Sequence, residues 1–110
     1  MTGGGRIFNV TATGSLHLKN VTLSGGNATE GGAIYNAGDL TLENVTLENN
    51  SAVRGGAIYN AGNLVMNGGA IQNNSASEFG GGIYNLGDMQ LDGVNIRDNN
   101  APEGSGVYQE

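Results

Sequence analysis

The chain has 110 residues, of which 21 are glycine and none is cysteine. This length suits one small domain, and the absence of cysteine excludes a disulfide framework, a Cys-ligated zinc site and a thiol nucleophile. Four basic residues against ten acidic ones give a net charge of −6, which argues against the positive surface that nucleic acids and anionic membranes attract. No apolar run approaches the ~18 residues of a membrane span, so we expect no direct membrane insertion.

A glycine-rich block recurs along the whole chain. It reads GGRIFN at residues 4–9, GGAIYNAG at 31–38 and again at 55–62, GGGIYNLG at 80–87, and GSGVYQ at 104–109. Successive blocks start 27, 24, 25 and 24 residues apart. A near-constant period of this size indicates stacked units that bury a shared core. We therefore expect a single domain over residues 1–110, with repeats at 4–30, 31–54, 55–79 and 80–103 and a partial repeat at 104–110.

A second block follows each glycine-rich block and alternates apolar with polar residues. It reads LHLKNVTL at residues 16–23, LTLENVTL at 40–47, LVMNGGAI at 64–71 and MQLDGVNI at 89–96. A period of two is typical of a half-buried strand, and no stretch has helical spacing over a useful length. Each repeat is therefore expected to contain about three short strands, joined at corners where glycine and asparagine supply positive φ.

These features predict an all-β fold, a right-handed single-stranded parallel β-helix with about 24–25 residues per turn and four to five turns. Strands of neighbouring turns would lie about 4.8 Å apart, and the handedness of parallel crossovers favours the right-handed coil. Phe79 is read as a one-residue insertion before the fourth repeat. The few residues before the first repeat are expected to form no cap.

The alternation also assigns faces. Arg6 occupies the third place of its glycine-rich block, and arginine is rarely buried, so we expect that place, including Ala33 and Ala57, to face solvent. The next residue, such as Ile34 or Ile58, then faces the core, the aromatic faces outward and the asparagine turns in at the corner. Leucine and methionine columns of the second block are expected to fill the core.

The outward aromatic column is the candidate partner-binding stripe. Its members are Phe8, Tyr35, Tyr59, Tyr84 and Tyr108. Exposed rings fit a sugar ring or a protein strand. The same column equally fits rings that stack on one another and stiffen their own sheet.

Charged residues also fall into columns. Arg54 is expected to lie between Glu30 and Glu78 as a surface charge ladder, and Lys19 to face Glu43 in the same way. His17 is read as a solitary surface histidine. The carboxylates of the columns Asp39/Asn63/Asp88 and Glu43/Asn67/Asp92 are interrupted by an amide. We therefore expect no catalytic residue, no metal site and no cofactor.

The repeats resemble the right-handed parallel β-helix repeats of bacterial surface proteins, and most closely the polymorphic outer-membrane protein repeat with its marks GGAI and FxxN. GGAI stands at residues 31–34 and 55–58, and the second mark stands with an aliphatic residue for Phe as LENN at 47–50, IQNN at 71–74 and IRDN at 96–99. The resemblance implies a parallel β-helix from an outer-membrane or extracellular protein. Such repeats serve as adhesin passengers, structural stalks and, with added loops, polysaccharide enzymes.

The function predicted is that of a non-enzymatic structural or adhesive segment of a bacterial cell-surface or secreted protein, which presents a repetitive face to a protein or glycan. Two alternatives stay open: a fragment of a polysaccharide-acting β-helix enzyme, and an engineered structural module with no ligand. An enzyme needs long loop insertions on one face, and the repeats contain none. The pattern starts and stops within a repeat, so we expect a piece of a larger parent or an engineered module.

An edge strand at Gly106, Val107 and Tyr108 is expected to associate end to end with another chain, because a β-helix leaves unpaired backbone groups on its end turns.

Overall fold

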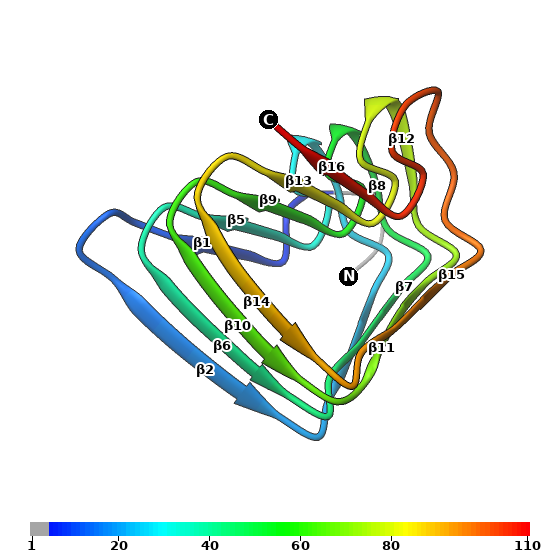
Figure 1. The fold of residues 1–110 in the computed structure, drawn as a ribbon. Helices are drawn as coiled ribbons and strands as arrows, with labels where there is room; N and C mark the ends of the chain where they lie inside the picture. Colours follow the sequence, from blue (N-terminus) through cyan, green and yellow to red (C-terminus); the bar gives the residue numbers. More distant parts are fainter. Residues whose placement is uncertain (1–4) are drawn as a thin grey trace.

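The computed structural model describes residues 5–110 and shows them as a coil of parallel strands (Figure 1). The first sheet contains β1 (Phe8–Val10), β5 (Ile34–Asn36), β9 (Ile58–Asn60), β13 (Ile83–Asn85) and β16 (Val107–Gln109). The second sheet contains β2 (Ser15–Lys19), β6 (Asp39–Glu43), β10 (Asn63–Asn67) and β14 (Asp88–Asp92). The third contains β3 (Thr22–Ser24), β7 (Thr46–Glu48), β11 (Ala70–Gln72) and β15 (Asn95–Arg97), and the fourth contains β4 (Asn27–Glu30), β8 (Ser51–Arg54) and β12 (Ser75–Phe79).

Every strand pairs in parallel with the equivalent strand of the neighbouring turn. Leu40 pairs with Leu64, and Leu64 with Met89, so the offsets of 24 and 25 residues read from the sequence are the offsets of the coil. The predicted all-β parallel β-helix of about four turns is thereby confirmed. The described residues form no helix, and hence no helical membrane span. The start of the first repeat at Gly4, and the expected absence of a cap before it, lie outside the described residues.

Each complete turn has four strands, one more than the three expected. The additional strands are β4, β8 and β12, whose sequences NATE, SAVR and SASEF lack large aliphatic residues at alternate positions. Without such residues the period-two signal is too weak to indicate a strand.

The predicted core columns are confirmed. Leu40, Leu42 and Leu47 are at most 1% exposed in the second turn, and Leu64 and Ile71 are equally buried in the third. Ile34, Ile58 and Ile83 are completely buried. Burying a side chain of this size stabilises a fold by roughly 1.5–3 kcal/mol, so these stacked columns are the main source of stability.

The outward assignment of the third place was wrong, because Ala33 and Ala57 are completely buried. The carbonyl oxygen of Ala57 accepts hydrogen bonds from the amides of both Ala33 and Ile34, each at 2.9 Å. Two successive amides sharing one acceptor break the strict alternation, as in a β-bulge. Two neighbouring side chains therefore point into the core.

Phe8 is not a member of the aromatic column, which corrects the predicted stripe. It pairs with Ile34, whereas Asn9 pairs with Tyr35 and Val10 with Asn36. Phe8 packs against the core, Asn9 is exposed and Val10 is 5% exposed. The first strand is thus shifted by one residue from the motif alignment, because a long side chain at Arg6 cannot occupy the buried third place that Ala33 fills.

The corners explain the glycine and asparagine pattern. Gly55 has φ +68°, and a Cβ on Gly56 would lie 2.2 Å from the carbonyl oxygen of Gly81, so this corner admits only glycine. Asn44 and Asn49 also have positive φ, at 52° and 58°, a conformation that asparagine tolerates better than most residues.

Phe79 is an insertion, as predicted. The pairing of β8 with β12 runs from Ala52 opposite Ala76 to Arg54 opposite Phe79, so the register shifts by one residue between these pairs.

Two ladders of side-chain amides, buried in the middle turns, run through the coil. Asn36 donates to Asn60 at 2.8 Å, Asn60 to Asn85 at 2.7 Å, and Asn85 to Gln109 at 2.8 Å. The second ladder links Asn50, Asn74 and Asn99 through side-chain bonds of 3.0 Å. Asn20 and Asn44 form no such ladder among the described residues, because both side chains are exposed at the corner.

Candidate functional site

Four tyrosine rings stack along the first sheet. Ring centroids are 5.1 Å apart for Tyr35 and Tyr59, 5.1 Å for Tyr59 and Tyr84, and 5.3 Å for Tyr84 and Tyr108, with interplanar angles of 7–15°. This arrangement follows from placing the same residue at the same position of successive parallel strands. The rings therefore pack against one another, as predicted by the interpretation in which the column stiffens its own sheet.

The stack is not the open face that the sequence predicted. Tyr59 is 8% exposed and Tyr84 is 6% exposed. Besides its neighbours in the stack, the ring of Phe79 lies 4.7 Å from that of Tyr108, and the Arg6 guanidinium lies 5.3 Å from the centre of the Tyr35 ring. A partner cannot reach the faces of these rings without displacing them.

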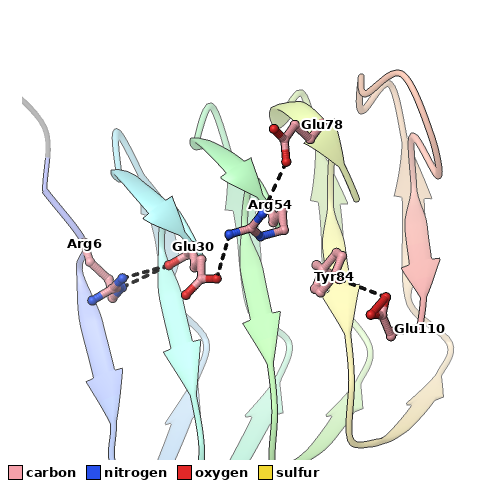
Figure 2. A network of polar contacts seen from close by, with 6 residues as sticks. All are labelled: Arg6, Glu30, Arg54, Glu78, Tyr84 and Glu110. Carbon is pink, nitrogen blue, oxygen red and sulfur yellow. Dashed lines mark hydrogen bonds and ion pairs between the residues drawn. The ribbon is translucent and has the colours of Figure 1, made fainter.

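Burial changes the acidity of the inner rings. It raises the pKa of Tyr59, and it raises the pKa of Tyr84 to about 12 together with the hydrogen bond that the Tyr84 hydroxyl donates to Glu110 Oε1 at 3.1 Å (Figure 2). A phenol that donates to a carboxylate in a poorly hydrated place keeps its proton. Tyr59 and Tyr84 therefore keep their protons at physiological pH.

The predicted charge ladder is confirmed beside the stack. Arg54 contacts Glu30 Oε2 at 3.0 Å and Glu78 Oε1 at 3.3 Å, and Figure 2 shows its guanidinium between the two carboxylates. The hydrogen bond with Glu30 raises the pKa of Arg54. Arg6 adds two bonds to the backbone oxygen of Glu30, at 3.2 and 2.9 Å. These partly exposed pairs fix the strand ends more than they stabilise the fold, since such pairs contribute about 1 kcal/mol or less.

Lys19 and Glu43 lie opposite each other on neighbouring strands, as expected, but their side chains form no ion pair among those of the described residues. Their Cα positions are partners in the pairing of β2 with β6. The Glu43 carboxylate instead contacts His17 Nε2 at 2.5 Å. His17 lies at the surface as predicted, but it has this acidic partner, which the alternation alone could not reveal because the two residues are diagonal neighbours.

In each acidic column an amide lies between the two carboxylates. Asn63 donates to Asp39 Oδ1 at 2.9 Å, so the intervening amide occupies the carboxylate. Among residues 5–110, no three His, Cys, Asp or Glu side chains gather as metal ligands.

The structure does show one hollow that the sequence analysis missed. This hollow, the serine–alanine trough, crosses β4, β8 and β12 and has a volume of about 620 Å³. Its lining residues are small and uncharged: Asn27, Ala28, Thr29, Ser51, Ala52, Val53, Ser75, Ala76 and Ser77. The signal for it was the recurrence of NAT, SAV and SAS at one position of three repeats. Small side chains at one place of successive turns leave a furrow along the coil.

Comparison with known proteins tests the resemblance to the polymorphic outer-membrane protein repeat. The family model of the Chlamydia polymorphic membrane protein repeat matches residues 44–61 and 71–86. These two segments are therefore similar to the polymorphic membrane protein repeat. Each matched segment runs from the third sheet, through the buried asparagine corner and the fourth sheet, into the glycine-rich block and the tyrosine strand.

No curated protein and no solved structure matches the chain significantly. This repeat is a repeat of outer-membrane and surface proteins, which agrees with a structural β-helix. The repeat family is not known for enzymes.

Proposed function

We propose that the chain is a non-enzymatic structural and adhesive segment of a bacterial cell-surface or secreted protein, and that it presents a repetitive face to a protein or glycan. The observation that carries the proposal is the family match, whose two segments fall on equivalent parts of successive turns. A coil made of equivalent turns acts as a rigid spacer with a repeated surface.

Two features support a non-enzymatic role over a polysaccharide-acting enzyme. The corners of the middle turns are short, such as the two residues between β5 and β6 or between β6 and β7. Short corners provide no loops that could close over a substrate and keep water away from it. The carboxylates of Asp39 and Asp88 lie on either side of Asn63, whose amide occupies one of them.

The serine–alanine trough replaces the tyrosine column as the face proposed to meet a partner. Five of its lining residues carry a hydroxyl or amide and four are aliphatic, so it offers hydrogen bonds without charge. Apart from the bond that Ser51 donates to Asn27, these side chains make no side-chain hydrogen bond within residues 5–110. Such a surface favours an uncharged, hydroxyl-rich partner, and a neutral glycan fits this description better than an acidic one on a chain of charge −6.

The test is binding of the purified chain to an array of neutral and acidic glycans. Ser75→Arg places a long charged side chain in the trough, and Asn67→Arg makes the same change of charge at the exposed C-terminal end of β10. We expect neutral glycans to bind, with affinity lowered about tenfold or more by Ser75→Arg and unchanged by Asn67→Arg. Binding of no glycan, binding of acidic glycans alone, or equal loss in both variants would contradict the proposed face.

A further inference from the structure

Each turn of the coil has two corners at which one residue takes a positive φ. The first corner joins the second sheet to the third, and the second corner joins the third sheet to the fourth. The strands before and after each corner pair from turn to turn, which makes its four places equivalent. These places are Asn20, Asn44, Gly68 and Gly93 at the first corner, and Gly25, Asn49, Asn73 and Asp98 at the second. All of them have φ between 52° and 79°, so glycine, aspartate and asparagine each serve this backbone conformation.

A hydroxyl residue two positions later accompanies asparagine at these places and never accompanies glycine or aspartate. The four asparagines are followed by Thr22, Thr46, Ser51 and Ser75, whereas the other four places are followed by Ala70, Asn95, Asn27 and Asn100. The corner itself does not require the hydroxyl, since Gly68 and Asp98 keep the same backbone without it. Within residues 5–110, no hydrogen bond joins an asparagine of these pairs to its hydroxyl; Ser51, for example, donates to Asn27 instead. The pairing of the two residue types therefore has no explanation within the fold.

Burial separates the asparagines in the same way. The buried asparagines of the described residues belong to the two ladders and are Asn36, Asn50, Asn60, Asn74 and Asn85. Each of them is followed two positions later by glycine or alanine. The four corner asparagines are exposed, and their side chains make no hydrogen bond among residues 5–110. Asn9 and Asn27 also begin Asn-x-Thr sequences, but both lie within strands, where backbone pairing holds them in the sheet. An exposed Asn-x-Ser/Thr sequence is an acceptor for N-linked sugars.

We propose that Asn20, Asn44, Asn49 and Asn73 are N-glycosylated by a transferase that uses a sugar activated as its nucleoside diphosphate ester. The side-chain amide nitrogen forms a bond to the anomeric carbon of the sugar. The bond from that carbon to the diphosphate oxygen breaks, the nucleoside diphosphate leaves, and the amide proton passes to a base of the transferase. The hydroxyl residue two positions later is the feature that the transferase recognises.

The coil limits the size of the sugars. Acceptors at one corner lie one turn apart, about 4.8 Å, so single sugars or short chains fit side by side and large branched ones do not. They would project at both ends of the strands of the third sheet. The modification does not require the serine–alanine trough to bind a partner, so it stands or falls separately from the proposed function.

The test is peptide mass spectrometry on two samples. One is the protein isolated from the cells that produce it, and the other is the purified chain after incubation with UDP-glucose and a soluble transferase specific for Asn-x-Ser/Thr. We expect a sugar on the four corner asparagines in both samples. Asn63, Asn67 and Asn95 are equally exposed but lack the hydroxyl two positions later. They are the internal control and should stay unmodified.

Two sets of variants test the role of the hydroxyl. Thr46→Ala should abolish modification at Asn44 and leave Asn20 modified, whereas Thr46→Ser should keep both, and circular dichroism should show that each variant keeps the β spectrum. The double variant G68N/A70T places both residue types at the equivalent corner of the third turn and should create a new acceptor. Unmodified corner asparagines in either sample would overturn the proposal. So would sugar on Asn63, Asn67 or Asn95, full modification of Asn44 in Thr46→Ala, or no new acceptor in G68N/A70T.

Discussion

Removing one buried amide from the first ladder should cost far more stability than removing an exposed one. Asn60 is completely buried, donates to Asn85 at 2.7 Å and to the carbonyl oxygen of Asp88 at 2.9 Å, and accepts from Asn36 at 2.8 Å. Asn60→Ala deletes these three bonds, together with a longer one to the carbonyl oxygen of Gly62 at 3.4 Å, and leaves buried partners behind. At about 1 kcal/mol per bond, the free energy of unfolding should fall by about 3 kcal/mol.

For a domain of this size, a loss of about 3 kcal/mol lowers the melting temperature by roughly 15 °C. The assay is thermal and urea unfolding followed by circular dichroism. Asn63→Ala is the control, because Asn63 is exposed and its side chain makes one hydrogen bond, to Asp39, so its loss should be about 0.5 kcal/mol or less. Asn60→Asp keeps the shape but cannot donate, and it should destabilise at least as strongly as the alanine variant. Equal losses for Asn60→Ala and Asn63→Ala would refute the ladder as a stabilising element.

Three further predictions follow from the geometry. Ile58→Asp places a charge in a completely buried column and should unfold the chain at room temperature, whereas Thr41→Asp on the outer face of β6 should change the melting temperature by only a few degrees; equal melting temperatures would contradict the assigned faces. Because the folded pKa of Tyr84, about 12, lies above its unfolded value of about 10, its contribution to stability is complete below pH 10 and should be lost as the pH rises toward 12; an ultraviolet titration should show a late component, and Glu110→Gln, which removes the carboxylate that accepts from the Tyr84 hydroxyl, should lower the midpoint of that component. Calcium and a chelator should both leave the melting temperature unchanged, and a substantial rise with calcium would show that the acidic columns bind it.

The sequence predicted most of the fold because the repeat supplies long-range register directly. Identical residues 24 positions apart predicted that Ile34 pairs with Ile58 and Leu40 with Leu64. The alternation predicted that the leucines face the core. Phe79 was also recognisable as an insertion from spacing alone.

The errors came where backbone geometry overrides the alternation. Ala33 is buried because one carbonyl accepts two successive amides, and no residue type signals such a bulge. Phe8 and Asn9 were misplaced by one position because the motif was aligned by its letters, whereas the strand aligns by which side chain fits the core.

The candidate site was harder to predict than the fold. The stacking of the tyrosines was foreseen, but the covering of Tyr59 and Tyr84 depends on how the rings of neighbouring turns and the side chains around them pack. The serine–alanine trough depends on the size of small residues in three separate repeats, a signal that carries no hydrophobic period.

The most direct test of the stacked parallel coil is nuclear Overhauser contact between backbone protons of successive turns in an isotope-labelled sample. We expect contacts between Leu40 and Leu64, between Leu64 and Met89, and between Tyr59 and Tyr84, in the parallel registers of the sheets. Contacts instead between antiparallel neighbours within one repeat, such as β6 with β7, would contradict the coil and the faces derived from it.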